Sequence, residues 1–292
     1  MDIDETAVAA AFAQPDIDGR FSGPLGDYLR IAGHRRPVLF FAFPPKAAGT
    51  FLRAAAIEAV GGSLVRGVHA QGGRDAQPYL PVFLQYYLGG LCAGPMVVHA
   101  HMQALPANRH FLEALGIRPV IMLRPIPDML ASYCDMLSAS ADPAIDGLNC
   151  PIPAAFATLP HAEKAGYLID VVAPWYAGYF ATWRDYARDC PDEVCILRYA
   201  DFLADAAAVL EAALRHADLP RSRAVCRSAV DGVWRERAAQ RFNKGVMGRG
   251  AAYFTPAHRA RLDALLGHFP ELAPWREDLL PAAAMSSGAA AD

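Results

Sequence analysis

A lysine and a glycine stand where a predicted strand gives way to a predicted helix. The segment reads Pro45-Lys46-Ala47-Ala48-Gly49-Thr50-Phe51-Leu52. Backbone N–H groups at a helix N-terminus point outward, and the helix dipole adds partial positive charge there. Gly49 allows a close approach of the backbone, Lys46 adds a charge and Thr50 adds a hydroxyl. The junction predicts an anion site; a plain turn with a solvated lysine is the other interpretation.

Lysine is rare in this chain, so its positions are informative. Of the 27 Lys and Arg residues, three are lysines: Lys46, Lys164 and Lys244. A lysine is a compact point charge on a flexible stem, whereas arginine is a planar fork. A G+C-rich genome would explain why lysine is scarce, but not where it is retained.

A second segment joins an arginine to a hydroxyl at another predicted strand-to-helix junction. It reads Leu123-Arg124-Pro125-Ile126-Pro127-Asp128-Met129-Leu130-Ala131-Ser132. Arg124 follows the predicted strand, and Ser132 lies one helical turn beyond Asp128 on the same face. An arginine beside a hydroxyl suits a phosphate, although an arginine in this place is also a common salt-bridge partner.

A third segment has glycines between basic side chains. It reads Arg241-Phe242-Asn243-Lys244-Gly245-Val246-Met247-Gly248-Arg249-Gly250. The N–H groups of such a loop can fold over an anion. A flexible surface loop is the other interpretation.

The loop at Lys46 does not match the phosphate loop of metal-dependent kinases. A Walker A loop reads GxxxxGK[ST], whereas here the lysine precedes the glycine. None of the apolar runs ends in the aspartate that holds Mg²⁺ in those enzymes. The sequence therefore predicts no metal site and disfavours a metal-dependent kinase or ATPase.

Two histidines end a further apolar run, Val97-Val98-His99-Ala100-His101. Residues i and i+2 of a strand point to the same side, so both rings can reach one site. Histidine transfers protons near neutral pH, which makes either ring a candidate general base. A zinc site at this pair lacks a third ligand at metal spacing.

Together these segments resemble the sulfotransferases that use 3′-phosphoadenosine 5′-phosphosulfate (PAPS). The family's 5′-phosphosulfate loop is similar to PKxxGTxL, which residues 45–52 match. Its 3′-phosphate motif is similar to RxxxDxxxS, which residues 124–132 match, with the motif's proline displaced to Pro127. Two of the three lysines, Lys46 here and Lys244 in the late loop, fall on lysine positions of the family's motifs.

The late loop resembles the family's RKGxxGDW with departures. Lys244, Gly245 and Gly248 match it, while Asn243, Arg249 and Gly250 replace its Arg, Asp and Trp. Arg241 or Arg249 would then take over the grip on the 3′-phosphate. Residues 194–203 resemble the family's strand and YEDL segment, and Trp175 and Trp183 its aromatic helix. The resemblance covers residues 37–270 with every segment in the family's order.

The resemblance implies in-line transfer of a sulfuryl group from PAPS to a hydroxyl or amine, without a metal. The other product is 3′-phosphoadenosine 5′-phosphate (PAP). By match to a segment like KTHLP, His101 is the implied base; His99, where the family often has lysine, is the alternative. Lys46 is implied to stabilise charge on the leaving 5′-phosphate. The implied donor-binding residues are Lys46, Ala47, Ala48, Gly49, Thr50, Phe51, Arg124, Ser132, Tyr199 beside the adenine, Asn243, Lys244 and Gly245.

The elements that must position these residues alternate along the chain. Short apolar runs at 38–43, 96–100, 120–123 and 194–197 predict strands buried on both faces. Helical patterns occupy residues 51–60, 79–88, 109–115, 128–137, 163–188, 202–216 and 255–269. This alternation predicts an α/β fold of three layers, with a central parallel sheet flanked by helices. The resemblance specifies the P-loop-like sulfotransferase fold.

We expect one domain over residues 37–280, after a lead-in at 1–36 and before a disordered tail at 281–292. The chain has 292 residues, 54% of them apolar, and a net charge of −3, which disfavours a disordered chain and a nucleic-acid binder. An acidic N-terminus, scattered cysteines and the interpretation of residues 165–183 as a buried helix rather than a membrane span indicate a cytoplasmic protein. The oligomeric state is not predicted.

Few basic residues occur in the segments expected to contact the acceptor. Arg74 is the one basic residue of 67–95, and 138–162 has none. A polyanionic glycan would need a basic groove, so we expect a small, apolar or aromatic acceptor. The aromatic residues of 79–88 either line that pocket or belong to a core helix.

Two other functions remain open at this point. One is a Mg-dependent P-loop nucleotide kinase or transferase, which would need a metal site. The other is a nucleotide-binding protein without catalysis, which the departures at Asn243 and Gly250 allow.

Overall fold

A computed structural model describes most of the expected domain. It covers residues 37–65, 83, 87, 94–140, 152–236 and 247–282. The lead-in at 1–36, the predicted ligands Asn243, Lys244 and Gly245, and the tail beyond 282 lie outside the described residues.

The core of the described part is a five-stranded sheet whose strands all run parallel, in the order β2-β3-β1-β4-β5. The strands are β1 (Val38–Phe41), β2 (Ser63–Val65), β3 (Met96–His99), β4 (Pro119–Leu123) and β5 (Cys195–Arg198). The apolar runs predicted four of them, because β1 and β4 are buried throughout and β3 nearly so. The edge strand β2 was missed, since it has three residues and two are half-buried.

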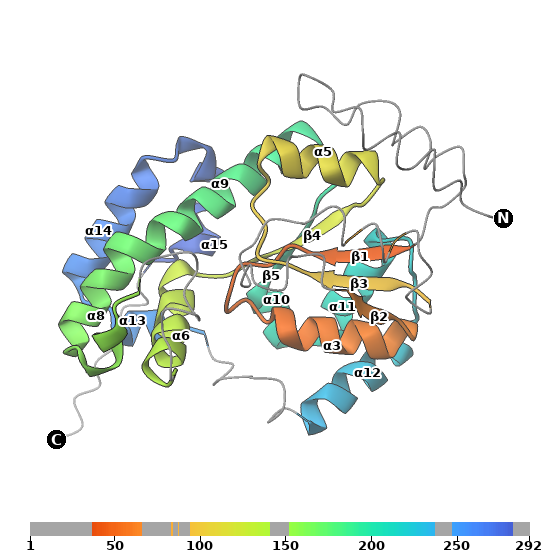
Figure 1. Cartoon of the computed structure of the whole chain (residues 1–292), viewed down its shortest axis with the longest axis horizontal. Coiled ribbons are helices and arrows are strands. Elements are labelled where there is room, and N and C mark those ends of the chain that lie inside the picture. The colour runs from red at the N-terminus through yellow and green to blue at the C-terminus, as the bar shows by residue number, and fades with distance from the viewer. Residues whose placement is uncertain are drawn as a thin grey trace.

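Helices cover both faces of the sheet, as the three-layer prediction requires. Figure 1 shows α5 above the sheet and α3 and α12 below it. The helices nearest the sheet are α3 (Gly49–Val60), α5 (Pro106–Ala114), α6 (Ile126–Ser138), α10 (Tyr199–Ala204), α11 (Ala206–His216) and α12 (Arg223–Arg235). The others are η1 (Ala154–Thr158), α8 (His161–Tyr167), η2 (Leu168–Val172), α9 (Ala173–Asp189), α13 (Arg249–Tyr253), α14 (Pro256–Gly267), η4 (Pro270–Trp275) and α15 (Arg276–Leu279).

The strand order gathers the predicted site at one edge. Strand β1 lies between β3 and β4, so the chain leaves β1 on one side and later crosses to the other. In open parallel sheets, ligands bind at the carboxyl ends of strands where the order reverses. Lys46 follows β1, His99 and His101 end and follow β3, Arg124 follows β4, and Tyr199 follows β5.

The predicted helix over 163–188 is present as three consecutive segments, α8, η2 and α9. The middle one is a π-helix, and the N–H of Ala173 bonds back to the carbonyl of Leu168. Pro174 has no N–H to continue an α-helical ladder, so the wider turn falls just before it. None of the described helices is long and apolar enough to cross a bilayer.

The prediction of one continuous helix over residues 202–216 was wrong. The pattern over 202–216 predicted a single helix, but the structure divides it into α10 and α11 at Asp205. The Asp205 side chain accepts a hydrogen bond from the N–H of Ala208 at 3.0 Å, which caps the second helix. An aspartate favours such a cap over a helix interior because its carboxylate competes for backbone N–H groups.

Candidate active site at the carboxyl edge of the sheet

The loop after β1 has a backbone that presents N–H groups to an anion. Lys46 and Ala48 have positive φ angles, 66° and 61°. Ala47 between them does not, and such alternation turns successive N–H groups toward one concave side. The first α3 hydrogen bond runs from the N–H of Leu52 to the carbonyl of Ala48, at 3.0 Å. The N–H groups of residues 49–51 therefore have no partner within the helix, and Ala48 makes no side-chain cap.

Gly49 is required by a neighbour within the protein. A Cβ placed on Gly49 would lie 2.2 Å from Nε2 of His99. The imidazole of His99 thus lies directly against the first residue of α3. The sequence predicted that a glycine lets the backbone approach a ligand; the structure shows that it also makes room for a histidine ring.

His101 is held in one orientation by the backbone. Its Nδ1 lies 2.7 Å from the carbonyl oxygen of Phe43, and the side chain is 7% exposed. A carbonyl can only accept, so Nδ1 carries the proton, and in the neutral ring Nε2 has the lone pair. The rings of His99 and His101 pack edge to face, 5.1 Å between centroids. The structure brings both predicted histidines together beside the loop.

Arg124 is a buried cation in the same place. The residue is 5% exposed, and its guanidinium carbon lies 4.0 Å from the centre of the Tyr199 ring. One terminal nitrogen donates to the carbonyl of Lys46, while Nε has no hydrogen-bond partner among the described residues. Burial lowers the pKa of Arg124, and Tyr199 and Asp128 oppose that shift. None of the described carboxylates forms an ion pair with it.

Asp128 joins α6 to the end of the late loop. Its two carboxylate oxygens accept from the N–H groups of Gly248 and Gly250, at 2.8 and 2.7 Å. A Cβ on Gly250 would lie 2.3 Å from the Cβ of Pro127. The displaced proline and the glycine, two departures from the family pattern, therefore contact each other. Ser132, one turn along α6, is 3% exposed.

Helix α9 holds the loops from outside the sheet. The Tyr176 hydroxyl donates to the carbonyl of Pro45 at 3.2 Å, and the Tyr179 hydroxyl donates to that of Ala42. The Trp183 indole N–H donates to the carbonyl of Met102 at 2.9 Å, beside His101. Sequence reasoning missed the two tyrosines. Their signal was the spacing of 176, 179 and 183, which places three polar-tipped aromatic residues along one helix face.

Solved structures share this architecture. Mouse sulfotransferase SULT7A1, crystallised with PAP, superposes with a TM-score of 0.60 over 82% of this chain and 85% of that one, at 14% identity. The chain has the sulfotransferase fold. Retinol dehydratase in complex with androsterone and the inactive cofactor PAP also matches, at 12% identity over 82% and 81% of the two chains, with a TM-score of 0.43. No protein-family model and no curated protein sequence matches the chain.

Within this fold, three further predicted ligands have defined places. Thr50 stands in the first turn of α3 and is half-buried. Phe51 has its side chain in the core, 4.8 Å from the Trp234 ring and 5.4 Å from that of Phe202, so its N–H alone can face the loop. Tyr199 is 2% exposed and lies beneath Arg124.

Arg249 lies near Arg124, and its charge contributes to lowering the pKa of Arg124. The Arg249 guanidinium forms an ion pair of 2.6 Å with Asp135 on α6. That Arg249 takes over the grip on the 3′-phosphate stays a prediction. The other candidate, Arg241, lies outside the described residues.

Two of the aromatic residues considered for the acceptor pocket belong to the core. Phe83 and Tyr87 are 0% and 2% exposed. The Phe83 ring packs 5.0 Å from that of Phe111 on α5. The core-helix interpretation therefore holds for both, and Tyr79 and Tyr86 lie outside the described residues.

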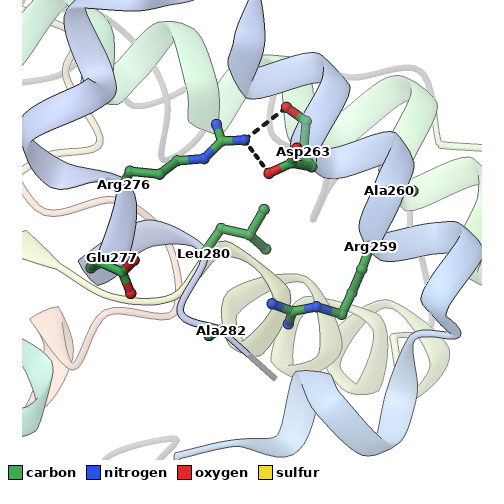
Figure 2. A pocket seen from close by; sticks show the side chains of 7 residues that line it. All are labelled: Arg259, Ala260, Asp263, Arg276, Glu277, Leu280 and Ala282. Atoms are coloured by element: carbon green, nitrogen blue, oxygen red, sulfur yellow. Dashed lines mark hydrogen bonds and ion pairs between the residues drawn. The ribbon is translucent and has the colours of Figure 1, made fainter. Parts of the chain in front are cut away.

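A surface hollow between α14 and α15 is a separate feature. Figure 2 shows its lining side chains, with Arg276 paired to Asp263 across it. Its lining residues are Arg259, Ala260, Asp263, Arg276, Glu277, Leu280 and Ala282. None of the predicted site residues is among them.

Proposed function

We propose that this protein is a PAPS-dependent sulfotransferase that acts on a hydroxyl or amine of a small acceptor. The observation that carries the proposal is Arg124. Its guanidinium is buried, has no carboxylate partner among the described residues, and has an Nε without a hydrogen bond. A buried guanidinium without a counter-charge lowers the stability of the fold unless a bound anion pairs with it. The loop beside it presents a second anion site, so the two fit a ligand with two phosphate groups.

The residues fit the donor in the following way. Lys46 and the N–H groups of residues 48–51 hold the 5′ end, where Ala48 and Lys46 have the positive φ angles. Arg124 and Ser132, both buried on the β4–α6 side, hold the 3′-phosphate. Bound PAPS supplies an activated sulfuryl group whose departure leaves negative charge on the 5′-phosphate. The N–H groups and Lys46 are positioned to stabilise that charge, as preorganised donors do.

His101 is the proposed general base. The Phe43 carbonyl fixes the proton on Nδ1, which leaves Nε2 to accept a proton from the acceptor hydroxyl or amine. His99 contacts Gly49 on the loop, so we assign it to the side of the leaving phosphate. The proposed acceptor is small and apolar or aromatic, supported by the absence of Lys and Arg from residues 138–162.

An activity assay tests the proposal. Purified protein is incubated with sulfur-35-labelled PAPS and a panel of phenols, alcohols and amines, with and without EDTA. We expect label transfer that EDTA does not affect. His101→Ala should lower the rate by about 10²–10⁴-fold and leave PAP binding near the wild-type value. The base assignment is wrong if His99→Ala loses activity while His101→Ala retains it.

A further inference from the structure

Arg124 reaches from one of the two proposed phosphate sites to the other. It leaves the end of β4, yet a terminal nitrogen of its guanidinium donates to the backbone carbonyl of Lys46, in the loop after β1. That carbonyl belongs to a residue with a φ of 66°. The hydrogen bond therefore joins a buried side chain at the 3′ side to a residue of the 5′ loop that has positive φ.

The conformation of Lys46 needs support from outside the loop. A side chain other than glycine disfavours positive φ, because Cβ approaches the following carbonyl oxygen. Such residues persist where surrounding contacts determine them. Contacts on this stretch include the Tyr176 hydroxyl, on the Pro45 carbonyl at 3.2 Å, and Arg124, on the Lys46 carbonyl. Arg124 itself is held in place by the Tyr199 ring at 4.0 Å.

We propose, on the basis of the proposed function, that Arg124 is a positioning residue for the 5′ loop as well as a ligand of the 3′-phosphate. One terminal nitrogen donates to the Lys46 carbonyl. The Nε–H has no acceptor among the described residues, so it is the donor available to a 3′-phosphate. The two phosphate sites are therefore coupled through one side chain. Loss of Arg124 disorders the 5′ loop even when no 3′-phosphate is present.

The first test measures the loop without any ligand. Hydrogen exchange is followed by mass spectrometry on peptides covering residues 44–52 in wild type, Arg124→Met and Ser132→Ala. Methionine keeps the packing on Tyr199 but has no donor. We expect exchange in this segment to rise about tenfold or more in Arg124→Met and to stay at the wild-type rate in Ser132→Ala. Thermal melts check that each variant is folded, and Arg124→Leu, which also has no donor, replaces Arg124→Met if the latter is not.

The second test separates the two roles with two ligands. PAP carries both phosphates, whereas adenosine 5′-phosphate lacks the one at the 3′ position. We expect Arg124→Met to weaken both ligands by about tenfold or more. Ser132→Ala should weaken PAP and leave adenosine 5′-phosphate at its wild-type affinity.

The outcomes distinguish this inference from the proposed function. If wild type binds PAP, but the folded Arg124 variants exchange at the wild-type rate and bind adenosine 5′-phosphate normally, the positioning role is overturned and the function stands. If wild type does not bind PAP, the proposed function fails. The exchange measurement still decides whether Arg124 holds the loop.

Discussion

The two ends of the proposed donor site are built in different ways. At the 5′ end, the proposed ligating groups are mainly backbone N–H groups, arranged by positive φ at Lys46 and Ala48 and by the start of α3, with the Lys46 side chain beside them. At the 3′ side, the proposed ligating groups are the buried side chains of Arg124 and Ser132. A site made of backbone depends on contacts that hold the backbone, whereas a site made of side chains depends on the helix that carries them. The two ends should therefore respond to different kinds of substitution.

The largest expected effect is at Gly49, where the backbone end has no spare room. In Gly49→Ala, the new Cβ would lie 2.2 Å from Nε2 of His99, so the loop or the ring must move. Overpacking of this kind costs about 1–3 kcal/mol, and we expect a loss of that size in urea unfolding together with weaker PAP binding.

A control glycine and a second substitution sharpen this test. Gly178 on α9 has no atom within 4 Å of the position that an added Cβ would take, so Gly178→Ala should not destabilise the protein. Adding His99→Ala to Gly49→Ala removes the clash and should recover part of the stability. Equal destabilisation in the two glycine variants would contradict the proposed contact.

An effect of comparable size on stability is expected at the side-chain end, from Asp128→Ala. This change removes the acceptor for the N–H groups of Gly248 and Gly250, of which Gly250 is buried. A buried donor without a partner costs about 1–3 kcal/mol. Hydrogen exchange should rise over residues 247–254 and stay unchanged over 44–52. Asp192→Ala, at an exposed position, serves as the control. Faster hydrogen exchange confined to residues 44–52 would reverse the assignment of the two ends.

The smallest effect is expected from Ala48→Gly, and it has the opposite sign. Ala48 has a φ of 61°, which costs an L-residue about 1–2 kcal/mol. Glycine removes that strain but adds about 0.5–1 kcal/mol of chain entropy in the unfolded state. We expect a gain in unfolding free energy of about 0.5 kcal/mol, measured by urea denaturation. A clear loss of stability would mean that the methyl group of Ala48 makes contacts that outweigh the strain.

The sequence predicted those parts of the fold whose signal is local. The strands β1 and β4 are wholly apolar because both faces are buried, and Gly61, directly after the predicted helix, ends α3 with a φ of 61°. Thr255, where the predicted helix over 255–269 begins, caps α14 by accepting from the N–H of His258. The sequence also predicted where the residues of the candidate site lie, because they follow strands that run parallel and so have their carboxyl ends on the same side of the sheet.

What the sequence did not predict depends on contacts between distant segments. Tyr179 donates to a carbonyl 137 residues earlier in the chain, and the Asp128 carboxylate reaches Gly250 122 residues later. In both cases the group contacted is a backbone carbonyl or N–H, so the residue type of the partner gives no signal in the sequence. The reason for Gly49 also lies elsewhere, in the ring of His99 on β3.

Calorimetry with PAP in the absence of added metal tests the central claim most directly. It compares wild type with Lys46→Ala and with Lys164→Ala, a control in which the lost lysine bonds the Ala157 carbonyl outside the site. We predict that wild type and Lys164→Ala bind PAP equally, and that Lys46→Ala binds about tenfold or more weakly. Absence of binding in wild type, or equal binding by all three proteins, would contradict the proposed nucleotide site.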